Sequence, residues 1–194
     1  MTDYEALSGE IEVFVKGHVK KSRYEHSIRV AECAVMLCRK FGLDEKKGWF
    51  IGIAHDMCKD FPKDELARLA ETDGMPVYDM EREKPALFHG RAAAVYLKEH
   101  YEVDDQSLLD AIAVHVSGAI GMGDYAKILY IADKTEAGRD HLSAEYRNAL
   151  YAMPLDAMMH KVLTDNFEYI KSQGYCIYPG TEKLIKSLKE NAGL

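Results

Sequence analysis

The chain has 194 residues, a hydrophobic fraction of 47% and a formal charge of -7 at pH 7. This length and apolar content suit one domain with a substantial core. Non-specific nucleic-acid binding depends on Lys and Arg side chains that neutralise phosphates, so the acidic charge argues against a nucleic-acid partner. An anionic ligand would need a local positive centre.

The N-terminal stretch MTDYEALSGEIEVFVKG carries acidic residues where a secretory signal needs basic ones. No apolar run approaches the roughly 18 residues of a membrane span, so no membrane partner is expected. The four cysteines form no Cys-x-x-Cys pair and lie mostly in apolar, helical surroundings, which favours reduced thiols over disulfides. We therefore expect a cytoplasmic protein.

Apolar residues recur at i, i+3, i+4 and i+7 along nearly every long segment, and only 5 residues are proline. The pattern predicts an all-α helical bundle, a single domain of about eight to ten helices over residues 1–194. Ser22 and Asp44 are predicted N-caps, and Gly42 a helix stop. In the first half of the chain we expect helices over residues 3–17, 22–41, 44–58 and 64–72.

Gly48 and Gly52 lie one turn apart on the third predicted helix, and this spacing would let another helix approach closely. Beyond it, the segment ETDGMPVYDMEREKP is the least regular stretch and is expected to be a loop. In the second half we expect helices over residues 85–101, 105–117, 124–136, 143–152, 155–173 and 181–191.

Six metal-capable side chains fall on the inner faces of five predicted helices. A single buried histidine is more often a hydrogen-bonded structural residue, but six such groups in one small bundle would leave many polar atoms unsatisfied without ions. Helix bundles build metal sites from side chains on facing helices. The sequence therefore predicts a metal centre made by His26, His55, Asp56, His89, His115 and Asp133.

A mixed shell of imidazole and carboxylate suits iron, manganese, cobalt or zinc better than magnesium or calcium, which prefer oxygen ligands. The ligand types alone leave those four metals open.

The order of these six residues resembles the HD-domain superfamily of metal-dependent phosphohydrolases. The contexts RYEHSIRV, AHDMCKDFP, LFHGRAAA, AIAVHVSG and YIADKTEAGR resemble its YqeK branch more narrowly, and the CIYPGTEKLI tail is also similar. The likeness spans about residues 20–140. We accordingly expect a metal-site core over that range and C-terminal helices over residues 143–194 of the same HD domain.

This resemblance implies a symmetrical hydrolase of diadenosine tetraphosphate that yields two ADP and uses two divalent transition-metal ions, with iron as the family's metal. One metal would be held by His26, His55, Asp56 and Asp133, and the second by His89 and His115 with Asp56 as the bridge. Two such ions would lower the pKa of a bridging water and offset charge on the phosphate and the leaving oxygen.

The same resemblance bears on how the substrate is held. The family's usual His-Thr-x-Gly reads His115-Val116-Ser117-Gly118 here, so Ser117 offers a substitute hydroxyl one position along. Positive groups close to the ligands in sequence are expected to bind phosphate, and Lys59 is also expected to act in catalysis with Asp56. The expected phosphate-binding residues are Arg23, Lys59 and Arg139. Lys134, which directly follows Asp133, is expected to point outward.

Other functions are compatible with the same ligands. They include another HD-type nucleotide phosphohydrolase, an oxygen-activating di-iron protein and a nucleotide sensor without turnover. The nearby positive side chains favour a phosphate substrate over oxygen chemistry, and the complete ligand set favours turnover over sensing. A cyclic-dinucleotide phosphodiesterase is disfavoured, because the second adjacent His and the Gly-Tyr-Pro signature are missing. A homodimer is compatible with the sequence, which does not reveal the oligomeric state.

Overall fold

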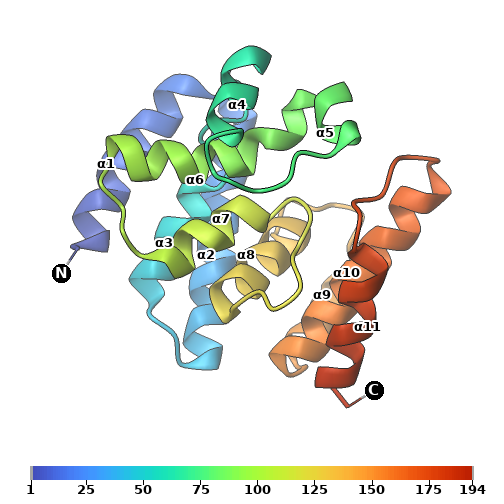
Figure 1. The fold of residues 1–194 in the computed structure, drawn as a ribbon. Coiled ribbons are helices and arrows are strands. Elements are labelled where there is room, and N and C mark those ends of the chain that lie inside the picture. The colour runs from blue at the N-terminus through green and yellow to red at the C-terminus, as the bar shows by residue number, and fades with distance from the viewer. Residues whose placement is uncertain (1, 194) are drawn as a thin grey trace.

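A computed structural model describes residues 2–193, and its regular structure in that range is entirely helical (Figure 1). The all-α prediction is confirmed, with one α-helix beyond the ten predicted segments. The helices are α1 Tyr4–His18, α2 Lys21–Phe41, α3 Glu45–Ala54, α4 Lys63–Ala70, α5 Asp79–Glu83, the 3-10 helix η1 Pro85–Phe88, α6 His89–His100, α7 Gln106–Val114, α8 Asp124–Thr135, α9 Ala144–Tyr151, α10 Leu155–Ser172 and α11 Thr181–Asn191.

The bundle is built around α2, α3, α7 and α8. Helix α2 packs on α3 and α8, α7 packs on α8 and α6, and α1 covers α3. Their inward faces supply a continuous apolar core that includes the fully buried Leu37, Phe50, Ile53 and Leu129. The packing of these helices therefore fixes where the turns that follow α3 and α7 lie relative to α2 and α8.

The C-terminal helices lie on one side of this bundle, away from α1 (Figure 1). Helices α10 and α11 pack on each other, and α10 also packs on α8 through buried side chains such as Met159 and Leu163. No helix within residues 2–193 has both the length and the apolarity to cross a bilayer.

The predicted start of α2 was wrong. The helix begins at Lys21, and its N-cap Lys20 makes no side-chain cap, so Ser22 lies inside the first turn. The Lys20 backbone N–H instead donates to Asp60 Oδ2 at 2.9 Å, which ties the helix start to the segment after α3. The predicted stop is confirmed, because Gly42 has the left-handed φ of 70° that favours glycine.

Helix α3 is shorter than predicted at its C-terminal end. Asp44 is its N-cap, as expected, but the helix ends at Ala54 and residues 55–60 form successive turns. The His55 ring N–H donates to the Gly52 carbonyl, the group that would accept the Asp56 amide N–H in a continuing helix. The imidazole therefore replaces the Asp56 amide as the donor to the Gly52 carbonyl, and the helix ends there.

The close contact between α2 and α3 depends on two glycines, as their spacing predicted. A Cβ atom on Gly52 would lie 2.3 Å from the Ala31 Cα, and one on Gly48 would lie 2.7 Å from Cys38 Sγ. The backbone of α2 thus occupies the space that a side chain on α3 would need.

We predict that Gly52→Ala lowers the free energy of unfolding by at least about 1–3 kcal/mol, because α2 and α3 must move apart. Gly9→Ala is the matched control: Gly9 is also helical, and its Cβ would meet nothing within 4 Å. That control should be neutral or stabilising by up to about 1 kcal/mol. Urea denaturation of both variants measures the difference, and equal stabilities would contradict the close helix contact.

Candidate metal centre

The six predicted ligands converge at one buried point in the described structure. His26 is in α2, Asp133 is in α8 and His89 is the first residue of α6. His55 and Asp56 follow α3, and His115 follows α7. Every one of the six is less than 9% exposed.

The Asp56 carboxylate lies between two groups of imidazoles. Its Oδ1 is 2.9 Å from His89 Nε2 and 3.7 Å from His115 Nε2. Its Oδ2 is 3.4 Å from His55 Nε2 and 4.0 Å from His26 Nε2. Two sets of possible ligand atoms, each lying within 4.8 Å of one another, therefore share Asp56.

Asp133 belongs to the side of the cluster that contains His26 and His55. Its Oδ1 is 3.0 Å from His26 Nε2 and 4.0 Å from His55 Nε2. One side of Asp56 thus faces two imidazoles and a second carboxylate, and the other side faces two imidazoles.

Three of the imidazoles are oriented by the same local bond. In His55, His89 and His115, Nδ1 donates to the backbone carbonyl three residues earlier, at 2.7 Å in each case. A ring that donates from Nδ1 presents an Nε2 lone pair when it is neutral, which is the form that binds metals. Two of these lone pairs face each other, since His89 Nε2 and His115 Nε2 are 3.1 Å apart.

The fourth imidazole is oriented by a residue that sequence reasoning missed. His26 Nδ1 donates to Glu136 Oε1 at 3.1 Å, and Glu136 Oε2 accepts from Arg29 Nε at 2.6 Å. Glu136 is only 2% exposed. It follows Asp133 by three residues, so the helical i, i+3 relation was the signal that could have identified it. A carboxylate behind a ligand histidine fixes its tautomer and raises its basicity.

The donor atoms fit a bound cation. His55 Nε2 and Asp56 Oδ1 are buried and have no hydrogen-bond partner among the described residues. Buried polar atoms normally have partners, and two facing lone pairs cannot bond each other. Metal ions at this point would satisfy the unpartnered atoms, and the nitrogen and oxygen donor set suits transition metals.

Electrostatics favour the same conclusion. Burial alone would raise the pKa of Asp56, but His55 and His89 outweigh burial and hold the pKa well below its usual range. Burial lowers the pKa of His115 to about 4, so this ring is neutral near pH 7. Burial would also lower the pKa of His55, yet the charge of Asp56 outweighs it and raises that pKa. The site therefore attracts positive charge beside His55, whether a proton or a metal ion supplies it.

The predicted phosphate-binding cations all lie at the rim of the cluster. Arg23 Nη1 is 2.7 Å from Asp56 Oδ2, and Lys59 Nζ is 3.8 Å from Asp56 Oδ1. Arg139 Nη2 is 3.0 Å from Asp133 Oδ1. About a third of each of these three side chains is exposed, so they border both the carboxylates and solvent.

The prediction for Lys134 was wrong. Its Nζ is 2.6 Å from Asp133 Oδ2 and donates to the His115 carbonyl at 3.4 Å, so the side chain bends inward. Burial would lower the pKa of Lys134, but the charge of Asp133 outweighs it and raises that pKa. Ser117 is not among the residues that contact the cluster; its Oγ donates to the Gly118 carbonyl at 3.0 Å, and it lines an adjoining cavity.

The structure thus holds a buried histidine and aspartate cluster inside a helical bundle, and its donor atoms suit metal ions. The HD domain family model matches residues 23–138, and the chain belongs to that family. HD-domain hydrolases are metal-dependent, which agrees with the two ligand groups found here.

Curated relatives carry a more specific name. Proteins from Bacillus subtilis and Halalkalibacterium halodurans are each 28% identical to this chain over 86% of its length and 89% of theirs. A Staphylococcus aureus protein is 30% identical over 64% of this chain and 63% of its own length. All three are named symmetrical bis(5'-nucleosyl)-tetraphosphatases.

A solved structure supports the fold. The predicted HD superfamily hydrolase involved in NAD metabolism from Clostridium acetobutylicum superposes with a TM-score of 0.86 and 24% identity. The match covers 98% of this chain and 99% of that one, so the C-terminal helices are included in the shared fold.

We predict that Glu136→Ala weakens metal retention by roughly 10- to 100-fold, because His26 loses the carboxylate that orients it. Glu32→Ala is the matched control, since Glu32 is exposed on the same helix as His26. Elemental analysis after dialysis against graded chelator concentrations measures the loss. Equal retention in the two variants would show that Glu136 does not support the site.

Proposed function

We propose that this protein is a metal-dependent hydrolase that cleaves diadenosine tetraphosphate at its centre and releases two ADP. The observation that carries the proposal is the division of the Asp56 carboxylate between two groups of imidazoles. The names of the Bacillus and Halalkalibacterium relatives, which are similar over most of both chains, support the choice of substrate.

The ligand assignment is part of this proposal. His26, His55, Asp56 and Asp133 would hold one ion, and Asp56, His89 and His115 would hold the other. Iron is proposed from the family resemblance, with manganese, cobalt and zinc compatible with the donor set. When bound, two such ions supply an activated water and neutralise charge on the phosphate and the leaving oxygen.

The side chains at the rim would hold the polyphosphate. Arg23, Lys59 and Arg139 are partly exposed and lie beside the two ligand carboxylates, so phosphate oxygens that approach the cluster come within their reach. A guanidinium can bind two phosphate oxygens in its plane, whereas Lys59 acts as a point charge. We assign Lys59 a direct role beside Asp56, because burial lowers its pKa and its ammonium also lies 3.0 Å from His89 Nε2.

We predict that protein loaded with iron or manganese converts diadenosine tetraphosphate to ADP alone. Anion-exchange chromatography separates the products. AMP plus ATP would keep the hydrolase and overturn central cleavage. Intact substrate together with rapid cleavage of another nucleotide would favour a different HD-type phosphohydrolase, and bound but uncleaved nucleotide would favour a sensor.

Asp56→Ala should abolish this activity, because one substitution removes a ligand from both groups and leaves the facing imidazoles without their shared carboxylate. Circular dichroism checks that the variant is folded, and metal analysis should show loss of both ions. Near-normal turnover in a folded variant would rule out the proposed bridging role.

Lys59→Ala should lower kcat/KM by roughly 10- to 100-fold, the effect expected when a charged hydrogen-bond donor is lost. Lys63→Ala is the matched control, because Lys63 is exposed at the start of α4, four residues away. Steady-state kinetics on diadenosine tetraphosphate compares the two. Equal kinetics would remove Lys59 from the proposed substrate-binding groups.

A further inference from the structure

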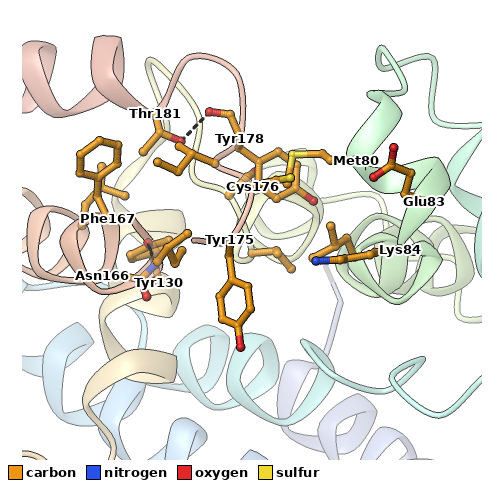
Figure 2. Close-up of a pocket in the computed structure, with 16 residues that line it drawn as sticks. Met80, Glu83, Lys84, Tyr130, Asn166, Phe167, Tyr175, Cys176, Tyr178 and Thr181 are labelled. Carbon is orange, nitrogen blue, oxygen red and sulfur yellow. Dashed lines mark hydrogen bonds between the residues drawn. The ribbon is translucent and has the colours of Figure 1, made fainter. Parts of the chain in front are cut away.

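A cavity of about 280 Å³ lies beside the metal centre, between the segment that contains α5 and η1, helix α10 and the loop that leads into α11 (Figure 2). Its walls are mainly apolar and aromatic, and they include Leu87, Leu163, Phe167, Ile170 and Tyr175. Small-molecule sites have this character: largely apolar walls with a few polar groups that fix orientation.

The cavity and the metal centre share part of their structure. Val116 and Ser117, which directly follow the ligand His115, line the cavity. Tyr130 also lines it, and Lys134 Nζ lies 4.6 Å from the Tyr130 ring centroid. The same ammonium is 2.6 Å from Asp133 Oδ2, so Lys134 stands between the cavity wall and the cluster.

Two polar features make the cavity more than an apolar gap. Asn166 lines it, and its amide nitrogen donates to the Tyr130 hydroxyl at 3.1 Å, which fixes the amide and leaves its oxygen as an acceptor. At the other side, Lys84 Nζ lies 5.5 Å from the Tyr175 ring centroid. Figure 2 shows the Glu83 carboxylate pointing away from Tyr175.

Tyr175 is the unusual residue of this site. The residue is 57% exposed although it belongs to the cavity lining, and in Figure 2 its ring extends from the loop, with Asn166 on one side and Lys84 on the other. An exposed aromatic face beside a positive side chain suits a nucleobase that stacks on it.

We propose that this cavity binds the adenine base of one half of the substrate, with Tyr175 as the stacking surface and Asn166 as a hydrogen-bonding group. The proposal rests on the proposed function and adds the position of the nucleoside. With a base in this cavity, the phosphates would run past Lys134 toward the metal centre. The positive charges of Lys84 and Lys134 match the anionic chain that leaves the base.

The test measures binding of ADP and of pyrophosphate to the metal-loaded protein by calorimetry. Tyr175→Ala should weaken ADP binding roughly tenfold, because one base loses its stacking partner. Tyr175→Phe keeps the ring and should bind ADP like the unmodified protein. Pyrophosphate has no base, so its affinity should be the same in all variants.

Tyr169→Ala is the matched control, since Tyr169 is 60% exposed on α10 and is not among the residues that line the cavity. Unchanged ADP affinity in Tyr175→Ala would overturn the proposal. An equal loss for ADP and pyrophosphate would also overturn it, because the ring would then act on the phosphate side.

The chromatographic assay of diadenosine tetraphosphate separates this proposal from the proposed function. Cleavage to ADP by all four proteins, with ADP affinity independent of Tyr175, would reject only the base-binding cavity. Selective loss of ADP binding in Tyr175→Ala, with no cleavage of diadenosine tetraphosphate by the unmodified protein, would support the cavity and reject only the substrate.

Discussion

The burial of the Asp56 carboxylate constrains how the whole bundle is assembled. Asp56 is 2% exposed, and an anion removed from water costs several kcal/mol unless positive groups surround it. Four imidazoles and the side chains of Arg23 and Lys59 do so here. These groups come from four separate stretches of the chain, so the packing of α2, α3, α6 and α7 decides whether the carboxylate is stabilised at all.

The cluster also determines where two helices stop. The Nδ1–H groups of His55 and His115 donate hydrogen bonds to backbone carbonyls near the ends of α3 and α7. Both helices end earlier than hydrophobic periodicity predicts. Periodicity describes which face is buried, and it contains no information about a ring that competes with the backbone for a carbonyl. These two helix ends could not be predicted from the pattern, although the convergence of the cluster residues could.

Most of the fold could be predicted because long amphipathic segments dominate it. Helix α5 could not, since five residues give little periodicity; the buried ion pair between Arg91 and Glu81 helps to hold it. At the site, Glu136 was missed because a charged residue at a helix end is usually exposed. The direction of Lys134 was predicted from its backbone position beside Asp133, but a lysine side chain is long enough to turn back toward a buried carboxylate.

The charge distribution explains how an acidic protein can receive a polyphosphate. The whole chain has a formal charge of -7, yet Arg23, Lys59, Lys134 and Arg139 crowd around the two carboxylates of Asp56 and Asp133. Glu136 adds a third carboxylate, which Arg29 already pairs. Apart from the pair of Arg29 and Glu136, four positive side chains therefore surround two carboxylates before any metal ion is counted. The surplus is local and partly buried, where charges are screened least, so it can attract phosphate without making the surface a general binder of nucleic acid.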